Sequence, residues 1–115
     1  MRRYEESNTQ RNAVKWFRIQ YPNHVLFSIP NGGARNKIEA AVLKGEGVLS
    51  GCADLFLACS SGFDNGMFIE MKSEKGRQTE SQKLFEKKVC LFGYKYVVCR
   101  SLDEFINEVN EYLKN

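Results

Sequence analysis

The sequence has few of the residues from which metal-thiolate sites, disulfide scaffolds and membrane spans are built. Its 115 residues include one histidine, His24, and four cysteines that show no Cys-x-x-Cys spacing. A zinc site is therefore not expected. Three of the cysteines lie within apolar runs, which favours reduced thiols and an intracellular protein. No apolar run approaches the length of a membrane span and no signal-peptide pattern opens the chain, so we expect a soluble, cytoplasmic protein.

A large excess of one charge is also missing. Seventeen basic and 14 acidic residues leave a net charge of +3, so attraction to a polyanion would need a local cluster of basic groups. The hydrophobic content of 43% suits a chain that buries one core. At this length we expect residues 1–115 to form a single domain.

Two apolar runs at the centre of the chain are separated by turn-forming residues. The runs cover residues 55–59 and 67–69, and residues 60–66 between them are rich in Ser, Gly, Asp and Asn. This pattern predicts a β-hairpin. An even-sum register, with its turn near Gly62 and Phe63, is one of the two ways in which the strands could pair.

Charged residues lie at one end of this hairpin. In the even-sum register Asp54 comes opposite Glu70 or Lys72, whereas a slip of one residue would separate them. Unpaired charges are costly to bury. The cluster therefore indicates either mutual ion pairs or a bound divalent cation.

The rest of the chain alternates between helical and extended patterns. We expect helices at about 4–20, 34–44, 79–92 and 101–113, and further strands at 24–29 and 94–99. The last two helices begin with capping-box sequences at Thr79 and Ser101. A helix between the third and fourth strands indicates a crossover connection. We therefore predict an α/β fold, with a mixed β-sheet of about four strands and helices on both faces.

Two further polar residues are expected near the charged end of the hairpin. Glu6 extends the inward stripe of the first helix by one turn, although an acid there equally suits the helix dipole. Gln82 begins the inward face of the third helix, although its side chain could serve only to cap that helix. A fringe of basic residues completes the pattern, and it consists of Arg35, Lys37, Lys44, Lys75 and Arg77. Such a fringe could bind a phosphate backbone, but each residue alone also suits a solvated surface.

An acid followed by a Glu-x-Lys pair on a buried strand is what metal-dependent phosphodiester hydrolysis requires. Carboxylates hold Mg²⁺ or Mn²⁺, which polarises the phosphate and activates a water. A lysine can orient that water or stabilise charge on the phosphate. The spacing of Asp54, Glu70 and Lys72 thus predicts a nuclease site.

Several segments together resemble one nuclease family. They are Gly51-Cys52-Ala53-Asp54, Glu70-Met71-Lys72, Gly76-Arg77 and Gln82, with Ile29-Pro30-Asn31-Gly32-Gly33, Arg35 and Leu43-Lys44-Gly45-Glu46-Gly47-Val48 before them. They are similar to the PD-(D/E)xK nuclease superfamily and, within it, to the VRR-NUC family. The resemblance implies a restriction-endonuclease-like fold. The chain differs from the family at Ala53, where proline is usual, which puts the geometry of this loop in question.

The resemblance also implies roles for individual residues. Asp54 and Glu70 match the metal-binding acids, Lys72 the catalytic lysine and Gln82 the glutamine that follows the core strands. Glu6 matches the acid contributed by the first helix, and would join Asp54 and Glu70 as a ligand of Mg²⁺ or Mn²⁺. The family spacing leaves open whether Glu5 takes the place of Glu6.

Stand-alone phage and bacterial members of the family resemble Holliday junction resolvases, so the likeness implies a homodimer acting in a bacterial or phage-infected cell. We therefore expect a divalent-metal-dependent, structure-specific endonuclease that cuts branched DNA such as four-way junctions. Two-fold symmetry would present two sites to two strands. The alternatives are an inactive nucleic-acid-binding module on the same fold, with the charges forming a buried ion-pair cluster, and a small structural partner in a phage or repair complex.

Overall fold

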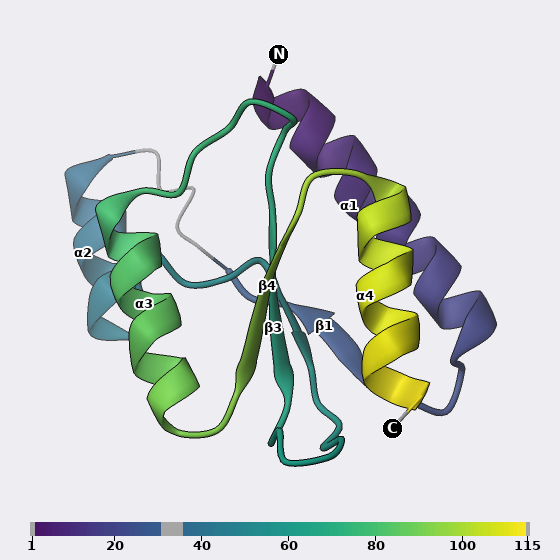
Figure 1. The fold of residues 1–115 in the computed structure, drawn as a ribbon. Helices are drawn as coiled ribbons and strands as arrows, with labels where there is room; N and C mark the ends of the chain where they lie inside the picture. The colour runs from purple at the N-terminus through teal and green to yellow at the C-terminus, as the bar shows by residue number, and fades with distance from the viewer. Residues whose placement is uncertain (1, 31–35, 115) are drawn as a thin grey trace.

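The computed structural model describes residues 2–30 and 36–114, and within them it contains four helices and four strands (Figure 1). In chain order these are α1 (Arg2–Gln20), β1 (Leu26–Ser28), α2 (Lys37–Gly45), β2 (Leu55–Leu57), β3 (Met67–Met71), α3 (Glu80–Leu91), β4 (Lys95–Cys99) and α4 (Leu102–Lys114). The predicted order is confirmed, and most boundaries agree with the expected ranges to within two or three residues.

The strands form one mixed sheet in the order β1-β2-β3-β4. The pairs β1/β2 and β2/β3 are antiparallel, whereas β3 and β4 are parallel and are connected through α3. Parallel neighbours need a long crossover connection, and the α3 segment supplies it. The predicted α/β fold with a mixed sheet is therefore confirmed.

Of the two registers that the sequence leaves open, the hairpin has the even-sum one. Leu55 pairs with Ile69 and Leu57 pairs with Met67, so paired residue numbers have an even sum. The same ladder continues at Asp54, whose backbone N–H donates to the carbonyl of Ile69 at 3.0 Å. Asp54 consequently lies beside the end of β3 that carries Glu70.

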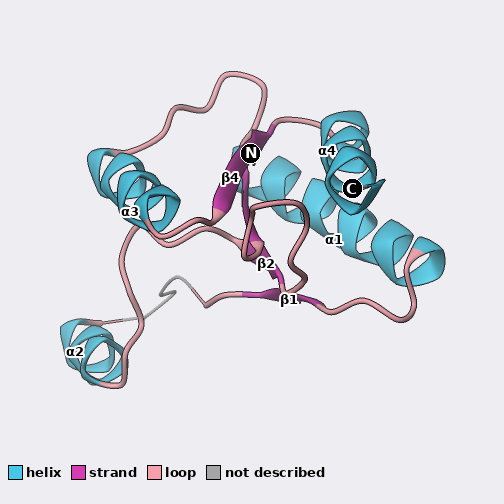
Figure 2. Ribbon diagram, turned by 60° about the horizontal axis from the view of Figure 1, so that its bottom comes forward, coloured by secondary structure: helices cyan, strands magenta, loops and turns pink. Residues whose placement is uncertain are grey.

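Helices cover both faces of the sheet (Figure 1, Figure 2). On one face α1 and α4 pack against the alternating apolar side chains of β2 and β3, and the buried core includes Phe17, Leu55, Leu57, Ile69, Phe105 and Val109. On the other face, aromatic rings of the sheet meet α3. The ring centroids of Phe56 and Phe68 lie 4.5 Å apart, and those of Phe68 and Phe85 lie 5.2 Å apart. In contrast, none of the side chains of α2 is buried.

The segment before Asp54 is held close to the start of α3. Gly51 has φ of +82° and a Cβ at this position would lie 2.6 Å from the carbonyl carbon of Ser81. Only glycine combines this backbone conformation with so close an approach. Gly51 therefore lets the backbone before Asp54 pass close to the start of α3.

Candidate active site

The fully buried carboxylate of Glu70 is the centre of the polar cluster at the end of β3. Glu70 has no exposed surface, and its Oε1 accepts hydrogen bonds from the Tyr96 hydroxyl at 2.5 Å and from Gln78 Nε2 at 3.0 Å. Its Oε2 has no hydrogen-bond partner. A buried acceptor without a partner is costly. This oxygen is therefore available to a cationic group.

Lys72 supplies the nearest positive charge. Its Nζ lies 3.7 Å from Glu70 Oε2, and 12% of its side chain is exposed. The separation is that of an ion pair and is longer than a hydrogen bond. Glu70 and Lys72 are two residues apart along β3 and its continuation, so strand alternation turns both to the same side.

Asp54 is the second acid of the polar cluster. Its Oδ2 accepts the backbone N–H of Met71 at 2.6 Å, which fixes the carboxylate across the end of β3. Burial raises the pKa of Asp54 above its usual value. The Met71 hydrogen bond lowers this pKa, the charges of Glu70 and Glu6 raise it, and Lys72 lowers it. Burial is the largest of these causes, so the net direction of the pKa is upward.

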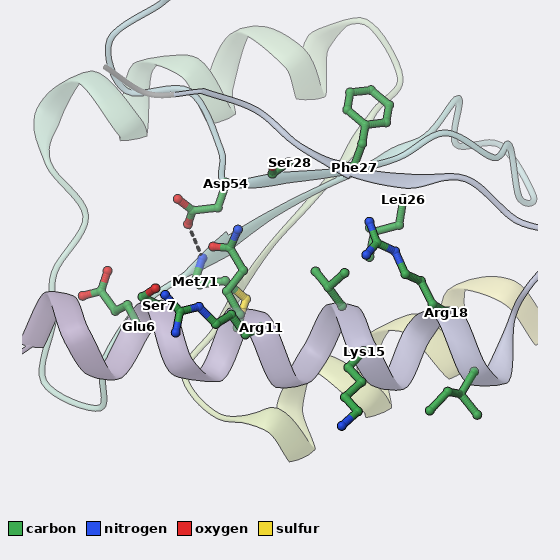
Figure 3. A pocket seen from close by; sticks show the side chains of 13 residues that line it. Glu6, Ser7, Arg11, Lys15, Arg18, Leu26, Phe27, Ser28, Asp54 and Met71 are labelled. Atoms are coloured by element: carbon green, nitrogen blue, oxygen red, sulfur yellow. Dashed lines mark hydrogen bonds between the residues drawn. The ribbon is translucent and has the colours of Figure 1, made fainter. Parts of the chain in front are cut away.

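The Asp54 carboxylate faces a cleft between α1 and the β1 edge of the sheet (Figure 3). The cleft has a volume of about 940 Å³, and Glu6, Arg11 and Arg18 of α1 line it together with Asp54 and Met71. Figure 3 shows Glu6 on α1, near the end of the cleft where Asp54 lies.

The structure places Glu5 and Glu6 of α1 differently with respect to the cleft. Glu6 lines the cleft and acts electrostatically on Asp54, whereas Glu5 is exposed and does not line the cleft. The first helix therefore brings Glu6 to the end of the cleft that holds Asp54. Whether Glu6 takes part in the reaction stays a prediction.

The structure places Gln82 in the capping box of α3. Its Oε1 accepts the backbone N–H of Thr79 at 2.8 Å, while the Thr79 hydroxyl accepts the N–H of Gln82. The amide that contacts Glu70 belongs to Gln78, which also donates to Glu86 Oε1 at 2.9 Å. The capping interpretation of Gln82 is thus the one seen in the structure, and its catalytic role stays a prediction.

Comparison with known proteins agrees with this geometry. The family model described as VRR-NUC domain matches residues 1–103. The chain belongs to the VRR-NUC domain family. A solved structure described as a VRR_NUC domain protein is also similar, with a TM-score of 0.79 and 25% sequence identity over 95% of this chain and 88% of that chain. No curated protein sequence matches the chain significantly.

As a VRR-NUC domain the chain is a nuclease-type domain. The ligand atoms of its three acids can therefore be compared with those that divalent cations prefer. Asp54, Glu70 and Glu6 offer only carboxylate oxygens, which suit hard cations such as Mg²⁺ and Mn²⁺. Glu70 Oε2 is buried without a hydrogen-bond partner, so the donor chemistry fits. Among the described residues no three metal-binding side chains are grouped around one point. Mg²⁺ is often held by one or two carboxylates and several waters, so this spacing is compatible with it.

Ala53, at the position where the VRR-NUC family usually has proline, is fully buried. Asp54 behind it still donates its N–H to Ile69 and accepts from Met71. The hydrogen bonds that hold Asp54 are thus present in this chain with alanine before it.

Three residues of this VRR-NUC domain were not expected from the pattern. Tyr96 and Gln78 hold Glu70, and Arg100 holds the loop that follows Lys72 by donating from Nη1 to three backbone carbonyls, those of Ser73, Glu74 and Gly76. Burial and the adjacent Glu70 carboxylate raise the pKa of Tyr96, which keeps its hydroxyl protonated as a donor. The parallel pairing of β4 with β3 brings Tyr96 beside Glu70 and Arg100 beside the loop after Lys72. The sequence indicates the crossover connection but not which side chains it brings into contact.

The described residues of the predicted basic fringe are exposed and lie in two segments of the chain. Lys75 and Arg77 are exposed in the loop after β3, whereas Lys44 is exposed in the last turn of α2, a helix on the face of the sheet opposite α1. Arg35 lies outside the described residues. Nucleic-acid binding by these residues stays a prediction. Within the described ranges no helix is long and apolar enough to cross a membrane.

Proposed function

We propose that this VRR-NUC domain is a divalent-metal-dependent endonuclease that hydrolyses phosphodiester bonds in DNA. The observation that carries the proposal is the buried Glu70 carboxylate, one oxygen of which has no hydrogen-bond partner while Lys72 and Asp54 lie beside it. A protein that needed this cluster only for stability would be expected to satisfy that oxygen. A catalytic site would instead keep it for a cation.

Each residue has a chemical role in this proposal. Asp54, Glu70 and Glu6 would hold Mg²⁺ or Mn²⁺, which when bound polarises the phosphate and lowers the pKa of the attacking water. Lys72 orients the water or stabilises negative charge on the phosphate. Tyr96 and Gln78 fix the position of Glu70, because both donate to its Oε1.

Branched DNA, such as a four-way junction, is the proposed substrate, and a homodimer is the proposed active form. The likeness of the chain to stand-alone VRR-NUC domains supports both, since a two-fold assembly suits a junction with two strands to cut. The exposed apolar side chains of α2 also support a dimer. Ile38 is 79% exposed and Val42 is 53% exposed, and a nine-residue helix without a buried side chain is marginal by itself. A second copy covering α2 would stabilise it.

Cleavage of a four-way junction, a flap and a linear duplex, measured side by side with Mg²⁺, with Mn²⁺ and with EDTA, tests the proposal. We expect metal-dependent cutting that is strongest on branched DNA and is abolished in Asp54→Ala, Glu70→Ala and Lys72→Ala. Circular dichroism would show that these variants remain folded. Binding without cleavage under any metal condition would instead identify an inactive nucleic-acid-binding module. Sedimentation of the purified chain tests the dimer.

A further inference from the structure

We propose that the cleft between α1 and β1 is the path of a single nucleic-acid strand, whose phosphates contact Arg11 and Arg18, with Lys15 at the rim. The inference rests on the proposed nuclease function and adds to it a substrate path that the predicted basic fringe does not contain. Three of the residues that line the cleft are cationic, and all three come from one helix.

The three cations form one row. Arg11, Lys15 and Arg18 have the spacing i, i+4, i+7, which places them along one side of α1, and all three are exposed. In Figure 3 Arg18 extends toward Leu26 of β1, whereas the Lys15 amine points away from the strands. Arg11 and Arg18 are therefore the expected direct contacts.

The three cations can be compared with the other basic residues near the site by the contacts that each makes. Within the described ranges neither Arg11, Lys15 nor Arg18 forms an ion pair or a side-chain hydrogen bond. Arg100, in contrast, is committed to three backbone carbonyls, and Lys72 to Glu70. The α1 row is thus free to bind anionic groups, and no internal contact explains why it lines the cleft.

The charge changes sign along the cleft. The acids that line it, Glu6 and Asp54, lie together at one end, and the rest of the charged lining is basic. A substrate whose backbone is held by the basic row would be led to the acids. Because the row begins after Glu6 and continues away from it along α1, the contacted phosphates lie on one side of the bond that is cut.

The dimensions suit a short length of one strand. Arg11 and Arg18 are separated by about 10 Å along the helix axis, which is roughly the axial rise of three nucleotides at about 3.4 Å each. Non-specific single-strand binding sites use such a positive groove to follow one backbone. One row of cations can follow only one backbone, so a duplex would have to separate at this point or place just one of its strands here. A branch point supplies such a strand.

Binding in EDTA tests the path without any contribution from metal or cleavage. The probes are a fluorescent single strand and a fluorescent four-way junction, and the variant is Arg11→Gln with Arg18→Gln. A matched control is Lys83→Gln with Lys87→Gln, which removes the same charge from exposed positions of α3. We expect the α1 variant to bind at least about tenfold more weakly. Its salt dependence should fall by about 1.4 in log-log slope for the single strand, because two phosphate contacts are lost.

The control variant should bind with an affinity and a salt slope close to those of the parent. Equal losses of affinity in the two double variants would contradict the proposed strand path. An α1 variant that binds as tightly as the parent would also contradict it. Neutral methylphosphonate linkages placed one at a time around the cut site give a second measurement. A neutral linkage on one side of the cut should weaken binding by the parent, and one on the other side should not. Neither should weaken binding by the α1 variant any further. The nuclease proposal fails separately, if the parent cuts no DNA with Mg²⁺ or Mn²⁺.

Discussion

Two hollows border β1, and they differ in chemistry. The cleft on the α1 side has a volume of about 940 Å³ and is lined by acids at one end and by Arg11, Lys15 and Arg18 along its length. The hollow on the α2 and α3 side has a volume of about 520 Å³ and is lined mainly by apolar groups, among them Phe27, Phe56, Phe68, Phe85 and Val89. The sheet therefore separates a charged surface from an apolar one.

The difference shows how four short strands can serve two kinds of contact. Strand alternation sends the aromatic rings of Phe56 and Phe68 to one face, while Leu55 and Leu57 turn toward α1 and α4. Polyanions would be attracted to the charged cleft, and an apolar partner surface to the other side. We therefore assign DNA to the α1 side and the proposed dimer contact to the side of α2.

Removal of the Glu70 charge should have the largest effect. Glu70→Gln keeps the shape of the side chain but removes the negative charge from the buried oxygen, so we expect cleavage of branched DNA to fall by about 10²- to 10³-fold. Binding in EDTA should stay close to that of the parent. The control Glu74→Gln changes an exposed acid nearby and should cut normally. A fully active Glu70→Gln variant would contradict the assignment of Glu70 to the active site.

A smaller loss is expected at Tyr96, which positions Glu70 through its hydroxyl. Tyr96→Phe should reduce cleavage by about 10- to 100-fold and raise the Mg²⁺ concentration needed for half-maximal activity. A merely structural role would lower stability without changing the metal dependence. Tyr94→Phe is the control, since the Tyr94 ring packs on Phe56 and Phe68 away from Glu70. An unchanged metal titration in Tyr96→Phe would contradict the positioning role.

Charged substitutions on α2 should weaken the proposed dimer without affecting DNA binding. Ile38→Lys with Val42→Lys places two charges on the exposed face of α2 and should weaken the proposed dimer by about tenfold or more, as measured by sedimentation. Binding of single-stranded DNA in EDTA should persist. Phe63→Lys, at the fully exposed tip of the hairpin, serves as the control. If the α2 variant sediments as the parent does, α2 is not part of a dimer contact.

The smallest expected effect is a gain in stability when the charge of Asp54 is removed, although the same change abolishes activity. A carboxyl whose pKa is raised by folding favours the folded state when it is protonated, so ionised Asp54 opposes folding at neutral pH when no metal is bound. Asp54→Asn keeps an acceptor for the Met71 N–H and should raise the melting temperature by a few degrees at pH 7 in EDTA.

This gain should shrink as the pH falls and vanish below the ordinary carboxyl pKa of 3.8, where parent and variant are both neutral. Thermal melting at several pH values measures it. A variant that is less stable than the parent at pH 7 would show that the charge of Asp54 does not oppose folding. Cleavage by Asp54→Asn should be lost in every case.

Much of the fold could be predicted from local patterns. The turn-forming residues 60–66 and the alternation on either side were enough for the hairpin, although not for its register, and the Thr79 capping box began α3 as expected. Helix boundaries were less certain, as at α2, which begins at Lys37 rather than near residue 34. The end of a short helix depends on cap geometry, here on Asn36 accepting the N–H of Glu39.

The sequence by itself determined the order of the elements, the hairpin and the shared face of Glu70 and Lys72, because strand alternation depends on residues close in the chain. The even-sum register that brings Asp54 to Glu70 was decided only by the tertiary structure. Only the tertiary structure decided that Gln78 rather than Gln82 contacts Glu70, that Tyr96 of β4 donates to Glu70, and that Arg100 after β4 holds the loop following Lys72. The packing of α1 likewise decided that Glu6 and the basic row share a cleft with Asp54. These contacts depend on how helices and parallel strands pack across long separations in the chain, and local patterns do not record that.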